Sequence, residues 1–309
     1  MKTKLLKFPE NTNNPLDCAD WMELVALVSP EGRCSIAAVE RNLKRLSAYD
    51  ASTTMQQNSK VEAACGEILG EMKRRALAAG GAYPFAVESA GIVTNGDASK
   101  FAPYIFCLCL SWFGWQQRRG NRTFPRRMFE DLSKYAAQAF VGGKALRFGA
   151  PRTEPLPRPF RDALTHLAIA IGEGQAREIE GSVNAQDDTL DLVAWRDFPD
   201  GAEGKLILVG QCASGANWEG KKRELDHLAF FNDWFSDQPP SLNHGMRVGF
   251  FVPCRVPKKK WIPTTRRAGI IFDRCRIAYW SQNNPEFKNR EGYCDWSRRA
   301  LAGLRQRGT

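Results

Sequence analysis

Two polar residues in strand-like, apolar surroundings are the first candidates for chemistry. Asp191 lies within the apolar run 189–195, and Gln211 follows the apolar run 206–210. A carboxylate in such a strand is costly unless it is paired, hydrogen-bonded or bound to a metal. Asp200–Gly201 predicts a hairpin, so the strands would pair and Asp191 and Gln211 would converge. A carboxylate with an amide carbonyl suits Mg²⁺. The alternative is an Asp191 bonded to backbone or arginine, with Gln211 an edge residue.

Two lysines follow Gln211 at the start of an expected helix. Residues 218–235 show helical spacing, and Asn217 can cap this helix. At about 100° per residue, Lys221 falls within the apolar stripe of this expected helix and Lys222 near its edge. An ammonium group facing the sheet can orient or deprotonate water, or stabilise a phosphate in the transition state. Lys222 is expected to face solvent or contact phosphate. The alternative for Lys221 is a side chain that snorkels to solvent.

The elements before residue 147 are mostly helical. Apolar spacing predicts helices over the ranges 17–28, 35–45, 60–78, 104–115 and 129–140, of which 104–115 is apolar on all sides and therefore buried. The first two helices flank a tight turn at residues 29–32. They fit a winged or plain helix-turn-helix that reads DNA, or an ordinary helical hairpin in a core.

The expected domain boundary is the proline-rich stretch Arg147–Pro159, which has little helix or strand potential. After it, helices and strands alternate: the sequence predicts a helix over 160–180, interrupted near Gly172–Gly174, strands at 189–195, 205–211 and 247–252, one or two strands over 270–280, and a helical tail. The predicted organisation is a mainly α-helical N-terminal domain, 1–146, and an α/β domain, 147–309, with a central mixed sheet flanked by helices.

The charge of the chain favours a polyanionic partner. The net charge is +10 and the isoelectric point about 9.2, which indicates nucleic acid, most simply DNA. The expected contacts are clustered basic residues: Arg118, Arg119, Arg122, Lys258, Lys259 and Lys260, with Lys222. A solvated basic face without a partner is the alternative. Tryptophans such as Trp218 and Trp261 would stack on bases or belong to the core.

The cysteines, the apolar runs and the absence of nucleotide-binding motifs limit the cellular location and the function classes expected for the protein. Nine cysteines without a CxxC pair favour reduced thiols in a cytoplasmic protein, with a zinc site built from scattered cysteines and the three histidines as the alternative. No apolar run reaches the length of a membrane span, and the start lacks a signal-peptide core, so no membrane association is expected. The absence of GxxxxGK[ST] and GxGxxG counts against nucleotide-dependent enzymes.

The order of elements over residues 160–280, with Asp191 and Gln211-Cys212, resembles the PD-(D/E)xK nuclease superfamily, the restriction-endonuclease-like fold. Its core is a helix, a strand meander, a helix and a further strand. Asp191 matches the motif's aspartate and Gln211 its Glu/Gln position, while Ala213 stands where the lysine belongs. Some members carry the lysine on the following helix, where Lys221 is the natural substitute. Glu173 matches the optional acid of the first helix.

The resemblance implies a nuclease that hydrolyses phosphodiester bonds in DNA with Mg²⁺ or Mn²⁺, in anti-phage defence or DNA repair. Asp191, Gln211 and Glu173 would hold the metal and Lys221 would assist. Ala213 supports an alternative: a catalytically inactive nuclease-fold subunit that binds nucleic acid or assembles with other subunits of a defence complex. A third reading is an unrelated α/β protein, such as a phosphate-handling enzyme.

Overall fold

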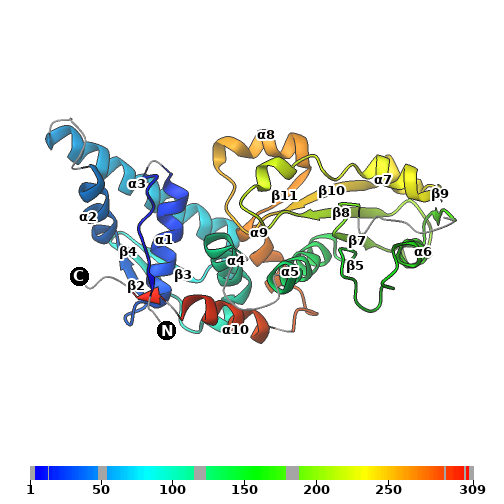
Figure 1. The fold of residues 1–309 in the computed structure, drawn as a ribbon, viewed down its shortest axis with the longest axis horizontal. Helices are drawn as coiled ribbons and strands as arrows, with labels where there is room; N and C mark the ends of the chain where they lie inside the picture. The colour runs from blue at the N-terminus through cyan, green and yellow to red at the C-terminus, as the bar shows by residue number, and fades with distance from the viewer. Residues whose placement is uncertain are drawn as a thin grey trace. The chain divides into compact units, whose positions relative to one another are not determined.

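The computed structural model describes residues 4–12, 14–47, 54–114, 123–178, 188–288, 290–302 and 304–305 (Figure 1). The protein is a mixed α/β chain with two compact units. The first contains residues 1–113 and 289–309, and the second contains residues 114–288. The C-terminal tail therefore returns to the N-terminal unit.

The first unit combines helices with a small antiparallel sheet. Its main elements are α1 (Pro15–Val28), β2 (Arg33–Ser35), α2 (Ile36–Ser47), α3 (Thr54–Ala79), β3 (Phe85–Glu88), β4 (Gly91–Thr94), α4 (Ala102–Phe113) and α10 (Arg290–Leu301). Strand β4 lies between β2 and β3 and is antiparallel to both. Short strands β1 (Lys4–Leu5) and β12 (Leu304–Arg305) pair in parallel, and two 3₁₀ turns, η1 (Gly80–Ala82) and η2 (Ala98–Phe101), complete the unit.

Local sequence explains the helices of this unit. The side chain of Asn14, rather than the expected Asp17, caps α1 by accepting the Leu16 N–H. The apolar helix α4 is buried along residues 102–110, as its all-round hydrophobicity predicts. The ring of Phe106 in α4 packs edge-on against Tyr293 and Trp296 of α10, which explains why the tail belongs here.

A buried charge cluster lies at the centre of the first unit. The fully buried Arg75 of α3 contacts Glu23 at 2.9 Å, Asp20 at 2.6 Å and Glu71 at 3.0 Å. The hydroxyls of the two buried tyrosines Tyr83 and Tyr104 donate to Glu23 at 2.8 and 2.9 Å. The carboxylates of Glu23 and Asp20 outweigh burial, which disfavours charge, and raise the pKa of Arg75 well above its ordinary value. Charge pairing therefore holds α1 to α3.

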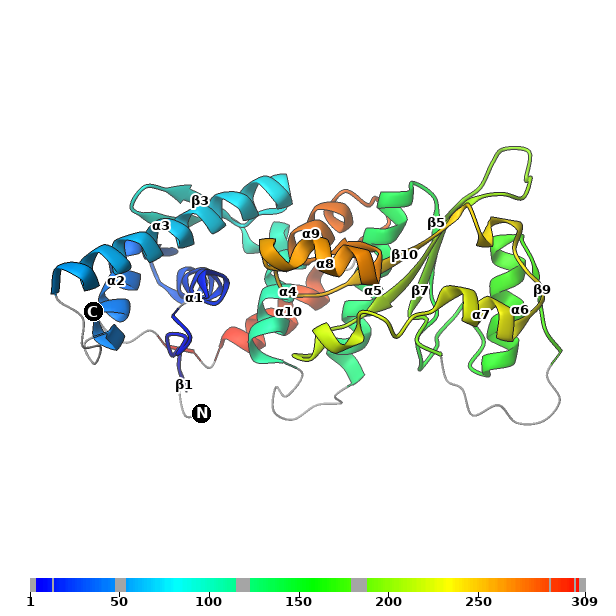
Figure 2. The same cartoon turned by 90° about the horizontal axis from the view of Figure 1, so that it is seen from above.

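The second unit is built on a mixed sheet of five strands in the order β11-β10-β8-β7-β5 (Figure 1). Figure 2 shows β5, β7 and β10 of this sheet from above. The strands are β5 (Lys144–Arg147), β7 (Leu192–Arg196), β8 (Leu206–Cys212), β10 (Met246–Phe251) and β11 (Ile270–Phe272). Strands β5, β7 and β8 form an antiparallel meander, and β10 and β11 add in parallel to β8. Strands β6 (Gln175–Ala176) and β9 (Phe235–Asp237) form a separate antiparallel pair.

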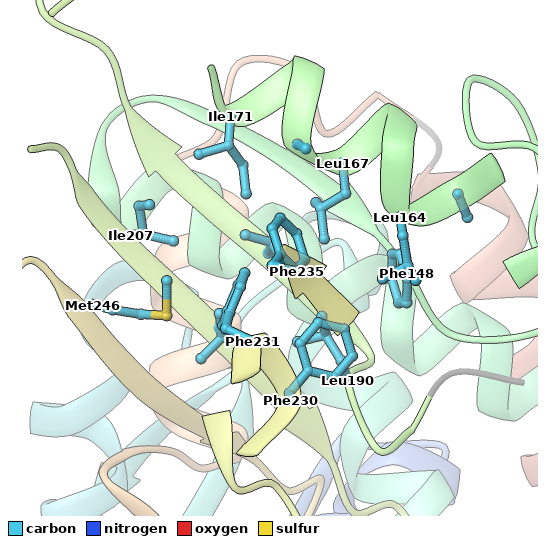
Figure 3. Packing of buried hydrophobic residues seen from close by; sticks show 14 of the residues in the cluster. Phe148, Leu164, Leu167, Ile171, Leu190, Ile207, Phe230, Phe231, Phe235 and Met246 are labelled. Atoms are coloured by element: carbon cyan, nitrogen blue, oxygen red, sulfur yellow. The ribbon is translucent and has the colours of Figure 1, made fainter. Parts of the chain in front are cut away.

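Helices cover both faces of this sheet. Helices α5 (Thr123–Val141) and α9 (Arg274–Gln282) pack together on one face, where Phe140 contacts Phe272 and Trp280. The other face carries α6 (Phe160–Ile171), α7 (His227–Trp234) and α8 (Lys258–Ala268). Figure 3 shows Leu164, Leu167 and Ile171 of α6 meeting Phe230 and Phe231 of α7 over the sheet residues of this core.

The unit boundary differs from the expected one at residue 147. Strand β5 pairs with β7 along its whole length, from Lys144–Trp195 to Arg147–Leu192, and α5 packs on β7. Residues 123–146 are therefore part of the α/β unit, and the proline-rich stretch is an internal loop of it. Long-range strand pairing sets this division, and local composition does not report it.

Two further expectations about elements were wrong. Residues 218–235 form a 3₁₀ turn, η3 (Trp218–Lys221), and the separate helix α7, because Asp226 caps a new helix start by accepting the Ala229 N–H. After β11, residues 274–282 form α9, capped by Asp273, instead of continuing as strand. The first of these changes moves the lysines of the expected site. Near the start of the unit, the expected helix 160–180 ends at Ile171, with Gly172 in a left-handed conformation.

Candidate functional site

Asp191 lies directly before β7, at the end of the sheet where β8 ends. Its side chain is buried, and Oδ2 accepts the backbone N–H of Cys212 at 2.6 Å. Oδ1 lies 3.9 Å from the guanidinium of Arg126, which α5 contributes. The hydrogen bond to backbone and the arginine together explain how a carboxylate is tolerated here.

A second acid, Glu130, accompanies Asp191 and was missed by sequence reasoning. Glu130 lies on the buried face of α5 and accepts from Arg126 at 3.0 Å and from Arg147 at 3.2 Å. A Cβ added at Gly149 would lie 2.9 Å from Glu130 Oε2 and 3.1 Å from Asp191 Oδ1. Both carboxylates therefore border the same small space, which exists because residue 149 is glycine. We call Asp191 and Glu130 the acid pair.

The signal for Glu130 was present in the sequence. Residues 129, 132, 136 and 137 of α5 are buried, and helical periodicity places Glu130 beside them on the same face. A carboxylate on an apolar stripe is the same anomaly that singled out Asp191. Because residues 129–140 were assigned to another domain, the two anomalies were not connected.

The electrostatics of the acid pair are mixed. Burial raises the pKa of Glu130, while Arg126 and Arg147 lower it less strongly. Burial, reinforced by the charges of Asp191 and Glu130, raises the pKa of the neighbouring Cys212 thiol well above its usual range. Cys212 is therefore a neutral thiol and no nucleophile. The pair combines an aspartate that accepts a backbone hydrogen bond with a glutamate whose charged form is costly.

The raised pKa of Glu130 makes the stability of the second unit depend on pH. Between its ordinary value of 4.5 and the raised folded value, the folded chain binds more protons than the unfolded chain. Stability contributed by this group is complete below pH 4.5 and is lost as the pH rises through the folded pKa. We expect Glu130→Gln to flatten the decline of unfolding free energy with rising pH, measured by urea unfolding at several pH values. Parallel curves for the wild type and the variant would contradict this.

Gln211 does not join Asp191. Successive side chains of a strand point to opposite faces, and Cys212 faces α5, whose Glu130 and Arg126 act on the pKa of its thiol. Gln211 therefore faces the opposite side with Ala213, which packs against Phe250 in the core below α8. Its Nε2 donates to Glu224 at 2.9 Å. The expected convergence of Asp191 and Gln211 on one metal is absent from this geometry.

The lysines follow Gln211 to that opposite face. Lys221 ends the 3₁₀ turn η3, is half-exposed and lies 3.3 Å from Glu224, the same carboxylate that Gln211 contacts. Lys222 lies 3.4 Å from Glu219 and stands over the Trp218 ring. The helix phase that placed Lys221 toward the sheet does not apply, because no helix runs through these residues. The contacts of Lys221 are with the Gln211 side of the sheet, away from the acid pair.

Glu173 is a structural acid at the far end of the sheet. It accepts the Lys205 N–H at 2.8 Å, the Ser241 N–H at 3.1 Å and the Ser241 hydroxyl at 2.9 Å. Lys205 precedes β8, whereas Asp191 contacts Cys212 at its other end, so the two acids are roughly 20 Å apart at the usual rise of a strand. Glu173 cannot share a metal with Asp191, and α6, which precedes it, is not the helix next to the acid pair.

We expect Glu173→Ala to destabilise the second unit by about 3 kcal/mol, because it leaves buried N–H groups without an acceptor. The control is Glu203→Ala, which removes an exposed carboxylate from the loop before β8. Chemical unfolding of both variants measures the difference. An unaltered stability of Glu173→Ala, or a metal-binding defect at full stability, would contradict a structural role.

The predicted nucleic-acid contacts divide into three groups. Lys258 and Lys259 are exposed in the first turn of α8, and Lys260 pairs with Glu219 across to η3. Lys222 is largely covered, beside Glu219 and over the Trp218 ring. Arg118, Arg119 and Arg122 lie outside the described residues. Trp261 stacks with Arg276, and Trp195 is buried in the core.

The donor set of the acid pair suits only a water-rich cation. Within the described ranges, no three His, Cys, Asp or Glu side chains gather closely enough to hold a metal ion. Mg²⁺, however, keeps several waters and uses one or two carboxylates, and the acid pair offers two carboxylates that both approach Gly149 closely. The residues therefore fit a Mg²⁺ or Mn²⁺ ion and no zinc site, and the nine cysteines are free thiols.

Comparisons of the chain with protein-family models, with curated proteins and with solved structures found no match. Among the described residues, no helix combines the length and apolar character needed to cross a membrane.

Proposed function

We propose that residues 114–288 form a metal-dependent phosphodiesterase domain that acts on DNA, with Asp191 and Glu130 as its acidic residues. The observation that carries this is the shared space at Gly149, bordered by one oxygen of each carboxylate. Two acids brought from separate elements to one point, beside a glycine at the end of a sheet, are the arrangement expected of a site for a hard cation.

The order of elements supports the proposal. With the insertion of α6 and β6 between β5 and β7 left aside, helix α5, the antiparallel meander β5-β7-β8, a helical segment and the parallel strand β10 follow one another. This is the helix, meander, helix and strand order of the PD-(D/E)xK resemblance. In this alignment α5 replaces α6 as the first helix, and Glu130 replaces Glu173 as its acid. Asp191 keeps the position given to it by the resemblance.

The side chains have distinct roles in this proposal. A bound Mg²⁺ would activate water and neutralise charge on the phosphate. Asp191, ordered by the Cys212 N–H, and Glu130, ordered by Arg147, would hold that ion. Arg126 is partly exposed beside both acids. Its guanidinium can bind a phosphate oxygen, which is the task of the missing lysine at Ala213.

A second candidate is a nucleic-acid-binding protein without catalysis, and two observations favour it. Arg126 and Arg147 already form ion pairs with Glu130, so the charge of this carboxylate is balanced without a metal ion. In the first unit, helix α1, strand β2, helices α2 and α3 and the hairpin β3-β4 follow in the order of a winged helix-turn-helix. In a helix-turn-helix the second helix of the pair, here α3, enters the major groove.

One experiment separates the candidates. The full chain is incubated with supercoiled plasmid and with single-stranded DNA in Mg²⁺, Mn²⁺ or EDTA, and binding is measured in parallel at rising salt. The nuclease proposal expects cleavage that EDTA abolishes. Binding that falls steeply with salt, with no cleavage under any metal, supports the second candidate and refutes the first. Cleavage that persists in EDTA refutes the metal site.

A further inference from the structure

A cleft of about 710 Å³ lies in the second unit, on the face of the sheet opposite the acid pair. It is bounded by the segment that leads into α7, by strand β10 and by the last turn of α8. Gln211 contributes to its lining, on the side of the sheet that Cys212 and Asp191 do not face. The cleft is therefore separate from the site proposed for catalysis.

The lining of this cleft is strongly basic. Among its described residues, the only carboxylate is that of Asp226. Its cationic side chains are those of Lys222, Arg223, Arg247, Arg266 and Arg267. Asp226 is itself used as the cap of α7, where it accepts the Ala229 N–H. An excess of positive charge in a concave surface concentrates anions.

Three of these guanidinium groups are available to a ligand. Across the described parts of the chain, Arg223, Arg266 and Arg267 form no ion pair, and all three are exposed. Two acids of the neighbouring segment are engaged elsewhere: Glu224 by Gln211 and Lys221, and Glu219 by Lys222 and Lys260. The planar guanidinium group can donate two parallel hydrogen bonds to a phosphate, and none of these three is used by a carboxylate of the described residues.

The floor of the same cleft is apolar. Leu225, Leu242, Met246 and Phe250 are buried beneath it, and Val248 lies beside them. An apolar floor with a few charged groups at the rim is typical of small-molecule sites, and the volume falls within their usual range of about 300–1,000 Å³. A ligand that fits has a flat apolar part and an anionic part.

We propose that this cleft binds a nucleoside phosphate, with the base on the floor at Val248 and Phe250 and the phosphate held by Arg266, Arg267 and Arg223. A free nucleotide and the terminal nucleotide of a nucleic-acid strand present the same chemistry. The proposal does not depend on catalysis at the acid pair, because it rests on residues of the other face.

The test measures binding to the full chain by calorimetry. The probes are AMP, adenosine, inorganic phosphate, and single-stranded oligonucleotides with and without a terminal phosphate. We expect saturable binding of AMP, the phosphorylated oligonucleotide or both, and much weaker binding of adenosine and inorganic phosphate. Binding of AMP but not of the phosphorylated strand would identify a free nucleotide as the ligand. Binding of the phosphorylated strand but not of AMP would identify the end of a strand. Absence of saturable binding, or equal binding of the unphosphorylated strand, overturns the proposal.

A matched pair of variants localises the site. The double variant Arg266→Ala/Arg267→Ala removes two rim charges and is expected to weaken binding about tenfold or more. Arg158→Ala/Arg196→Ala removes the same charge from two exposed positions of the second unit outside the cleft, and is expected to bind close to the wild type. Equal losses in both double variants would show a response to net charge alone and would overturn the assignment.

His227 gives an independent readout inside the cleft. Burial lowers the pKa of His227, and Arg247 lowers it further against the opposing effect of Asp226. A phosphate bound in the cleft adds negative charge nearby and is expected to raise that pKa. Nuclear magnetic resonance titration with and without ligand measures it, with the resonance assigned by His227→Gln. An unchanged titration at saturating ligand would place the ligand elsewhere and overturn the proposal.

Discussion

Replacing Arg75 by methionine is expected to destabilise the first unit by about 3–5 kcal/mol, because it leaves buried carboxylates without their counter-charge. Arg75 is fully buried, and Glu23 beside it has no exposed surface. The two tyrosine hydroxyls that donate to Glu23 cannot replace a full positive charge. Methionine keeps the aliphatic part of the side chain and removes the guanidinium, so the loss of the counter-charge and its hydrogen bonds is expected to dominate.

The matched control is Arg74→Met at the neighbouring position. Arg74 is half-exposed and, within the described part of the chain, forms an ion pair only with Glu71, at 3.0 Å, so its loss is expected to cost at most about 1 kcal/mol. Urea unfolding measures both variants, and hydrogen exchange in α1 and α3 assigns the loss to the first unit. Adding Glu23→Gln to Arg75→Met is expected to restore part of the stability. If Arg75→Met were as stable as Arg74→Met, the charge cluster would have no structural role.

The second large effect concerns the acid pair. We expect Asp191→Asn to lower DNA cleavage about 100-fold or more, since even residues that only orient metal ligands typically account for 10–100-fold. Asparagine keeps an oxygen for the Cys212 N–H, so the fold is retained and the lost charge is isolated. Glu130→Gln is expected to reduce cleavage similarly, because it removes the other carboxylate that borders the space at Gly149.

The controls for this prediction come from the opposite face. Gln211→Ala and Lys221→Ala are expected to cleave at close to the wild-type rate, because both side chains contact Glu224 and not the acid pair. Cleavage rates at saturating Mg²⁺ and Mn²⁺ measure all four variants, after circular dichroism has verified folding. If Gln211→Ala lost most of its cleavage activity while Asp191→Asn stayed active, the site would include Gln211, as the PD-(D/E)xK motif predicts, and the acid pair would be refuted.

Much of the fold was predictable because it depends on local chemistry. The helices around residues 36–47, 54–79 and 102–113 follow from spacing, caps and apolar content. The hairpin of β7 and β8 follows from two apolar runs and a turn. The mixed sheet flanked by helices was expected in outline. The nuclease reading, its Mg²⁺ or Mn²⁺ ion, its DNA substrate and its defence setting stay predictions.

The sequence by itself determined that Asp191 is a buried acid in need of partners. It did not determine which side of the sheet that acid faces. Leu190 and Val193 both pack into the α6–α7 core, so strand alternation breaks between them and Asp191 turns toward α5. Backbone conformations with positive φ at Asp188 and Thr189 precede this break. A one-residue irregularity reverses the face of a side chain, and no spacing rule reports it.

Only the tertiary structure decided which residues meet at the site. Strand β5 pairs with β7, and this pairing carries α5, Glu130 and Gly149 to Asp191 from a part of the chain that composition had assigned elsewhere. The same packing leaves Gln211 and Lys221 on the far face, where a basic cleft lies instead. Local sequence specifies the helices and strands and shows which polar residues lie in apolar surroundings. Which residues these polar side chains contact depends on pairing between distant segments of the chain.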